Sequence, residues 1–296
     1  MEALLSRLSR GDVIVGDGAW GTELFARGLP LGQPPESWTL EQPEVIGAIA
    51  RDYMDAGAEI ITTNTFGGSP ARLRQHGLAD RMQEINTQGV ALARDVARER
   101  AYVSASVGPT GLLLRPVGDA DPVDVADGFA RQIAALASAG VDIICIETMT
   151  DLREAILAVE AARRGAPGTA VIATMTFDRT PRGPFTIMGV SVAEAARGLE
   201  RAGADVVGAN CGTGVEAMIA VSDEFSRHTG LPIAVRPNAG NPERRGSRLV
   251  YPDTPERFGE AAATFADQGV RIIGGCCGTT PAHIRALRAA IARRRG

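Results

Sequence analysis

A six-residue pattern recurs four times along the chain and constrains its fold more than any other feature. It places a glycine second and an apolar pair at its end, and it spans residues 56–61, 139–144, 202–207 and, more loosely, 268–273. Each glycine is typical of the residue after a helix end, and each apolar pair is typical of a buried parallel strand. The repeat therefore predicts four helix-to-strand units.

The same alternation of apolar runs and amphipathic stretches extends through the whole sequence. We expect strands at Val13–Val15, Glu59–Thr63, Tyr102–Val107, Asp142–Glu147, Ala170–Thr174, Asp205–Ala209, Ile233–Arg236 and Arg271–Gly274. We expect helices at Pro43–Ala56, Ala71–Glu99, Val123–Ala139, Leu152–Arg164, Val192–Ala202, Val215–Thr229 and Pro255–Gln268. Eight strands with helices between them predict a single (β/α)₈ TIM barrel domain over residues 1–296, with a doubly wound open sheet as the alternative.

Polar and thiol residues follow the repeated strands at equivalent positions. The residue seven places after each repeat glycine is Asn64, Glu147, Asn210 or Cys276. In a barrel these positions lie at the carboxyl ends of strands two, four, six and eight, which is the face where barrel enzymes carry their active sites. The pattern therefore predicts one polar site at that face.

Three cysteines are candidates for a metal site at these strand ends. Cys276 and Cys277 are adjacent and cannot easily form a disulfide with each other, but they can bind one soft metal ion with Cys211 as third ligand. Cys211 precedes Cys276 by about two βα units, so the ligands would come from strands six and eight. Zinc is favoured because thiolates suit it and a fourth position stays open for substrate. The alternative is three buried apolar cysteines, which is the role we expect for Cys145.

A glycine-rich loop after the first strand contains a second candidate. Residues 16–21 match the pattern G-x-G-x-x-G, but no clean helix and second strand follow, so we reject a dinucleotide site. We expect a strand-end loop in which Asp17 projects into the site. A solvated turn aspartate is the alternative.

Two further polar residues end apolar strands. Glu147 needs a partner there, either a substrate ammonium or a barrel arginine. Thr63 fits a hydrogen-bonding site residue or simply a β-branched strand residue. The three histidines, His76, His228 and His283, fall on expected helices or their ends and match no metal-binding pair, so we expect no histidine catalysis.

Composition excludes several classes of protein. All 31 basic residues are arginine, which excludes Schiff-base lysines, pyridoxal phosphate attachment and a P-loop. The net charge of −4 and the short basic run at 293–295 do not indicate nucleic acid binding, and no apolar run reaches the length of a membrane span. Four cysteines without a secretory signal indicate a reducing compartment, so we expect a cytoplasmic protein without a membrane or nucleic acid partner.

Taken together, the motifs resemble the homocysteine S-methyltransferase family over essentially the whole chain. The matching segments are Asp17–Thr22, Thr63–Gly67, Gly108–Gly111, Glu147–Thr148, Asn210–Cys211, Pro237–Gly240 and Gly274–Pro281. The resemblance implies a barrel with zinc held by Cys211, Cys276 and Cys277. It also implies that Asp17 and Glu147 bind the homocysteine amine, and that Gly18 and Thr63 line the pocket.

The resemblance also bears on the methyl donor. Three segments look most like the homocysteine module of cobalamin-dependent methionine synthase, namely Pro35–Trp38, Asn238–Gly240 and Tyr251–Pro252. We therefore expect methylcobalamin on a separate corrinoid protein as donor, with homocysteine as acceptor and methionine as product. An enzyme that uses S-methylmethionine or another small donor is the main alternative. A non-catalytic zinc-binding subunit of a corrinoid methyltransferase system is a third interpretation.

Overall fold

Eight parallel strands form the centre of the computed structural model, which describes residues 2–245 and 248–295. They are β1 (Ile14–Val15), β2 (Ile60–Thr62), β3 (Tyr102–Val107), β4 (Ile143–Met149), β5 (Ala170–Met175), β8 (Val206–Asn210), β9 (Ile233–Arg236) and β12 (Val270–Ile273). Each pairs with its neighbours in chain order, and β12 pairs with β1. The N–H of Glu59 donates to the carbonyl of Val15 at 2.7 Å, and Gly16 bridges to Ile60, so the first two strands meet and close the barrel.

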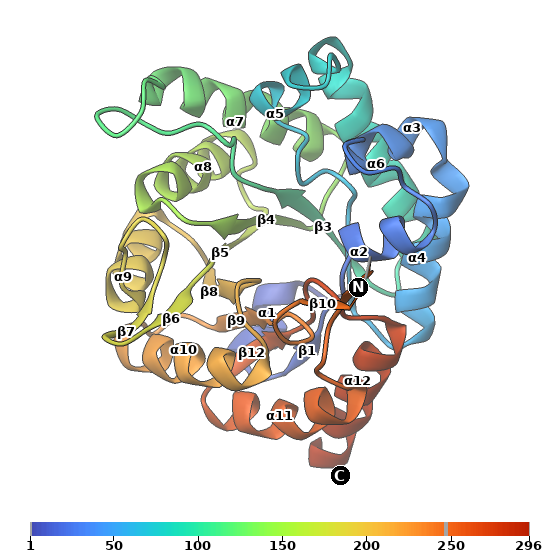
Figure 1. Cartoon of the computed structure of the whole chain (residues 1–296), viewed down its shortest axis with the longest axis vertical. Helices are drawn as coiled ribbons and strands as arrows, with labels where there is room; N and C mark the ends of the chain where they lie inside the picture. The colour runs from blue at the N-terminus through green and yellow to red at the C-terminus, as the bar shows by residue number, and fades with distance from the viewer. Residues whose placement is uncertain (1, 246–247, 296) are drawn as a thin grey trace.

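Helices form a ring around this barrel, as Figure 1 shows. The main ones are α4 (Pro43–Asp55), α6 (Met82–Ala97), α7 (Pro122–Ser138), α8 (Leu152–Gly165), α9 (Val192–Ala202), α10 (Val215–His228), α11 (Pro255–Asp267) and α12 (Pro281–Arg295). The structure is therefore the predicted TIM barrel and not an open sheet. Within the described residues, no helix is both long enough and apolar enough to cross a membrane.

The repeat glycines occupy the positions that the sequence predicts. Gly57, Gly140, Gly203 and Gly269 have φ angles of 97°, 84°, 103° and 86°, and each follows the end of a helix. A side chain would be strained in this left-handed region, which is why glycine recurs there. These turns set the start of β2, β4, β8 and β12, so the strand-end residues that follow share one face of the barrel.

One predicted helix is wrong in its extent. The stretch 71–99 is not continuous but forms α5 (Pro70–Arg74), the 3₁₀ turn η2 (Ala79–Arg81) and α6. The break is at Gly77, which has a φ of 69°. The N–H of Leu78 bonds back to the carbonyl of Leu73 at 2.9 Å, which completes a helix-ending turn.

Additional short elements lie near the barrel ends. They are α1 (Leu4–Ser9), α2 (Gly21–Ala26), η1 (Pro35–Ser37), α3 (Trp38–Glu41) and the two hairpins β6–β7 (Asp178–Thr180 and Gly183–Phe185) and β10–β11 (Glu243–Arg245 and Arg248–Val250). The hairpins follow β5 and β9, so both are insertions after barrel strands.

Two apolar regions stabilise the barrel. One lies between the strands and the outer helices, where the strands are buried. The other fills the barrel interior, and Leu4 and Leu8 of α1 belong to it together with strand residues such as Ile143 and Cys145. Cys145 is 4% exposed, so the prediction that it is a core residue is confirmed.

Candidate active site

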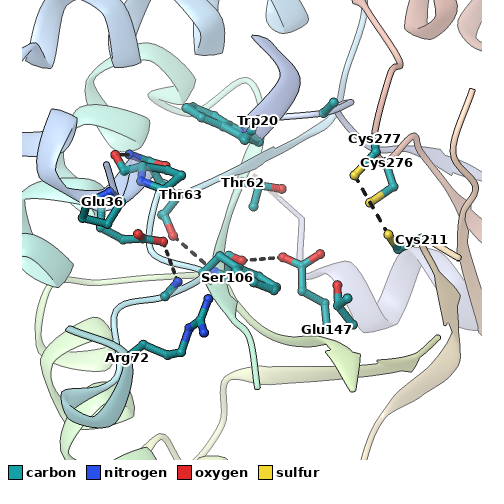
Figure 2. A pocket seen from close by; sticks show the side chains of 18 of the residues that line it. Trp20, Glu36, Thr62, Thr63, Arg72, Ser106, Glu147, Cys211, Cys276 and Cys277 are labelled. Atoms are coloured by element: carbon teal, nitrogen blue, oxygen red, sulfur yellow. Dashed lines mark hydrogen bonds between the residues drawn. The ribbon is translucent and has the colours of Figure 1, made fainter. Parts of the chain in front are cut away.

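Three cysteine side chains converge at the carboxyl ends of β8 and β12. The sulfur atoms of Cys211, Cys276 and Cys277 all lie within 4.8 Å of one another, and Figure 2 shows them grouped together. Backbone hydrogen bonds set this arrangement. Cys211 donates to the carbonyl of Arg236 at 3.0 Å, and Cys276 donates to that of Pro237 at 2.8 Å. The end of β9 therefore holds both cysteine loops in register.

Because the three thiols are close together, their pKa values differ from one another. Hydrogen bonds from Cys276 and Cys277 lower the pKa of Cys211 to about 3. The bond to Cys211 in turn raises the pKa of Cys277 to about 12 and that of Cys276 well above its usual range. Three sulfurs that converge in this way, with two of them retaining protons, suit a divalent soft metal, which would take the place of those protons. The donor set therefore fits zinc.

The paired cysteines sit on a turn that is bound to the loop after β1. The hydroxyl of Thr279 donates to the carbonyl of Cys276 at 2.7 Å and accepts from the N–H of Ala19 at 3.0 Å. The hydroxyl of Tyr53 donates to the carbonyl of Ala19 at 2.7 Å. A Cβ on Gly18 would come 2.7 Å from the Tyr53 ring, so only glycine fits at this crossing.

A pocket of about 350 Å³ opens beside the thiols. Its polar lining residues include Thr62, Thr63, Ser106, Glu147, Thr148 and Arg236, and it is also lined by Gly18, Trp20, Pro34, Pro35, Glu36, Phe66 and Arg72. Figure 2 shows Glu147 between Ser106 and the cysteines, with Glu36 and Arg72 on the opposite side. Of the predicted substrate residues, the structure therefore brings Gly18, Thr63 and Glu147 to one pocket with the three cysteines.

Asp17 lies at the same end of the barrel but has no exposed surface. Its carboxylate accepts from the N–H of Thr62 at 2.7 Å, the Thr62 hydroxyl at 2.8 Å, the Trp20 indole at 3.0 Å and Arg236 at 2.6 Å. It is a bound, buried carboxylate and not a solvated turn residue.

Glu147 is buried and has fewer partners. One of its oxygens accepts a hydrogen bond from the hydroxyl of Ser106, and the other lies 3.7 Å from Arg236. Burial raises its pKa, against the opposing effects of Arg236 and Ser106. The alternative partner for Glu147, an arginine of the barrel, is therefore present only at the long distance of 3.7 Å.

Thr63 and the histidines take modest roles in the geometry. The Thr63 hydroxyl lies 2.6 Å from that of Thr65 and accepts from the N–H of Ser106 at 3.2 Å, so it braces the pocket wall between β2 and β3. His76 is among the residues that line the pocket. His283 is buried near the start of α12, where its ring bonds to the carbonyl of Asp253 at 3.0 Å and to Thr280.

Sequence reasoning missed three polar residues of this site. Arg236 is a charged residue at the end of the apolar strand β9, just as Glu147 follows the apolar part of β4. The strand-end pattern that identified Glu147 could therefore have identified Arg236. The repeat predicts the position of Asn210 at a strand end but assigns it no role. Its amide binds Thr148 and Thr174 at 2.7 Å and lies 4.0 Å from the Cys276 sulfur. Glu36 is 4% exposed and accepts from the N–H of Gly67 at 2.5 Å, which no local pattern indicates.

Comparison with known proteins agrees with this geometry. A methionine synthase of Mycobacterium tuberculosis is 36% identical over 95% of this chain, and the chain spans only 25% of that protein. A betaine–homocysteine S-methyltransferase 1 of Xenopus laevis is 32% identical over 100% of this chain and 77% of its own length. The metallated form of the Escherichia coli homocysteine methyltransferase MmuM superposes with a TM-score of 0.79 at 26% identity, covering 96% of this chain and 98% of that one. A family model described as homocysteine S-methyltransferase matches residues 14–291, and the chain belongs to that family.

Proposed function

We propose that the protein is a zinc-dependent methyltransferase that converts homocysteine to methionine. The observation that carries this proposal is the meeting of Cys211, Cys276 and Cys277 in one pocket with the buried carboxylate of Glu147. A thiol-binding centre and an ammonium-binding centre in the same pocket fit the two ends of an aminothiol. Family membership supports the same acceptor.

The three cysteines would hold zinc and leave one position for the substrate sulfur. Bound zinc would lower the pKa of the homocysteine thiol, so that the thiolate exists near neutral pH. The surrounding residues fix this centre. Backbone bonds from β9 hold the cysteine loops, and the Asn210 amide lies beside the Cys276 sulfur.

Negative charge at the strand ends would orient the rest of homocysteine. Asp17 and Glu147 supply the negative charge that attracts the substrate ammonium, and Gly18 and Thr63 line the pocket beside it. A charge-assisted hydrogen bond in such a buried setting contributes about 1.5–3 kcal/mol to binding. This charge selects an amino acid thiol over a simple thiol.

Methyl transfer needs no further base once the thiolate is formed. The homocysteine sulfur attacks the methyl carbon, a sulfur–carbon bond forms, and the bond from methyl to its donor breaks with its electron pair leaving on the donor. The product methionine is a neutral thioether and a weaker zinc ligand than a thiolate, so it can depart.

For the donor we propose methylcobalamin carried by a separate corrinoid protein. The methionine-synthase-like segment around Glu36 and the identity with methionine synthases support it. Cobalamin is too large for a pocket of about 350 Å³, so the corrinoid protein would dock over the strand-end face that carries the thiols. A small-donor enzyme is the second candidate, because Trp20, Phe66 and Glu36 line the same pocket as Glu147.

A competition experiment tests the donor. Zinc-loaded protein is given homocysteine with methylcobalamin and S-methylmethionine at equal concentration, and methionine is measured with the methyl group of one donor labelled. We expect faster transfer from methylcobalamin. The variant Cys276→Ala with Cys277→Ala corrects for any uncatalysed methylation. Faster transfer from S-methylmethionine would identify a small-donor enzyme, and no transfer from either donor to bound homocysteine would favour the non-catalytic subunit.

A further inference from the structure

Arg236 is a buried cation between two carboxylates. It is the last residue of β9, and its exposed fraction is 9%. Its Nη2 donates to Asp17 at 2.6 Å, whereas its Nη1 lies 3.7 Å from Glu147. Among the described residues, its Nε has no hydrogen-bond partner. One guanidinium therefore serves two acids unequally, with the stronger bond to Asp17.

The hydrogen-bonding capacity of Asp17 is filled by the protein itself. Each of its oxygens accepts two hydrogen bonds, from Arg236 and the Thr62 hydroxyl on one side and from the Thr62 N–H and Trp20 on the other. A carboxylate offers about four lone-pair sites. Asp17 consequently has no acceptor site left for a ligand in this arrangement.

Glu147, by contrast, keeps one oxygen for a ligand. Its Oε1 accepts from Ser106, but the 3.7 Å between Oε2 and Arg236 is longer than a hydrogen bond. Glu147 lines the pocket, and Figure 2 shows its carboxylate beside the thiol cluster. This oxygen accepts no hydrogen bond from the described residues and is therefore placed to accept from a substrate group.

We infer that Asp17 and Arg236 form a positioning pair, in which Asp17 holds the guanidinium away from Glu147 and so keeps Glu147 available for the substrate ammonium. The inference rests on the proposed homocysteine-binding function. The two acids and the arginine together carry one net negative charge, which matches one ammonium. Asp17 thus acts on the substrate through Arg236 and without contact.

The pair predicts an unusual result for removal of Asp17. In Asp17→Asn, the amide no longer binds the guanidinium as a charge partner, and Arg236 is released to pair with Glu147 at the ammonium position. Homocysteine binding should then weaken by about tenfold or more. The further change Arg236→Met removes the competing cation and restores the single negative charge, so the double variant should bind homocysteine within about threefold of the wild type.

Calorimetric titration of zinc-loaded protein measures these affinities without a methyl donor. The ligands are homocysteine and its amine-free analogue 4-mercaptobutanoate, whose affinity should stay nearly constant across the variants. The matched control is Asp205→Asn with Arg163→Met, which removes another Arg–Asp pair with a 2.6 Å contact, at the opposite end of β8. That control should not change homocysteine affinity. Zinc content and thermal unfolding of each variant establish that it is folded and loaded.

The inference is overturned if Asp17→Asn with Arg236→Met binds homocysteine as weakly as Asp17→Asn alone. If that double variant does not fold, Asp17→Asn is combined with Glu147→Gln. The losses of homocysteine affinity in the two single variants should then not add in the combined variant, because Glu147→Gln has already removed the carboxylate that Arg236 would pair with. Additive losses would overturn the inference as well. Wild-type protein that binds no homocysteine would overturn the proposed function itself, whereas tight binding unaffected by these variants would overturn only the positioning pair.

Discussion

The same barrel strands carry two layers of opposite character. Ile143 and Cys145 of β4 point into the apolar interior, and Glu147, two residues further on the same face, reaches the pocket. The backbone geometry is the same in both layers. What differs is the neighbouring side chains, which are mostly apolar in the barrel interior and mostly polar at the carboxyl ends of the strands. The chemical role of a residue in this fold is therefore set by its height along the strand.

The cysteines show this contrast most clearly. Cys145 belongs to the apolar interior cluster and has no second thiol beside it. Burial raises its pKa well above the usual range, and the Glu147 carboxylate adds to the rise. Cys211 lies in a cluster, where hydrogen bonds from Cys276 and Cys277 lower its pKa to about 3. An isolated buried thiol is inert, whereas a thiol among other thiols is prepared for a metal.

Removing thiols from each layer should separate the two roles most strongly. Cys276→Ala with Cys277→Ala leaves zinc with one protein ligand, so we expect loss of bound zinc and of methyl transfer. Zinc per chain, measured by plasma emission spectrometry, checks the first expectation. Cys145→Ala is the control and should retain about one zinc per chain. Full occupancy in the double variant, or zinc loss in the control, would show that the wrong thiols are assigned.

A truncation in the lower layer should affect stability and not chemistry. Ile143 is fully buried in the barrel interior, and Ile143→Ala leaves a cavity that costs about 2–5 kcal/mol of unfolding free energy. Urea denaturation measures the loss. The folded fraction should still bind zinc and homocysteine as the wild type does. A change in homocysteine affinity equal to that of a pocket variant would mean that the two layers are not independent.

A change of one charged group in the upper layer should do the reverse. Glu147→Gln removes the charge proposed to hold the ammonium, and we expect homocysteine affinity to fall by roughly 10–100-fold, which corresponds to about 1.5–3 kcal/mol. Zinc content should not change. Titration with 4-mercaptobutanoate provides the comparison, because this thiol has no amine. Equal losses for both thiols would assign Glu147 a structural role instead.

The layered arrangement also explains which features the sequence could predict. The repeat glycines require a left-handed backbone, and this local requirement located four strands correctly. Gly77 has the same requirement, yet amphipathic residues on both sides of it favour a continuous helix, and the break was not predicted. Local patterns thus locate elements well, except where a glycine lies between two helical segments whose amphipathic patterns resemble one continuous helix.

The site divides along similar lines. The convergence of Cys211 with the paired cysteines follows from their spacing in βα units. Their strands, β8 and β12, are the sixth and eighth of the barrel and lie close around the closed ring. The partnership of Asp17 and Arg236 spans 219 residues, and neither residue carries a local signal for the other. Contacts of that kind depend on side-chain direction inside the barrel, which the sequence pattern alone does not specify.

The Thr279 hydroxyl, which ties the paired cysteines to Ala19, has a consequence for the order of assembly. The Ala19 N–H and the Thr279 hydroxyl are 260 residues apart, so during synthesis the loop after β1 emerges long before its partner on the cysteine turn. Two of the three sulfurs are therefore absent until β12 has docked beside β1 and closed the ring. Metal uptake by the proposed centre would then follow closure of the barrel and could not guide its early folding.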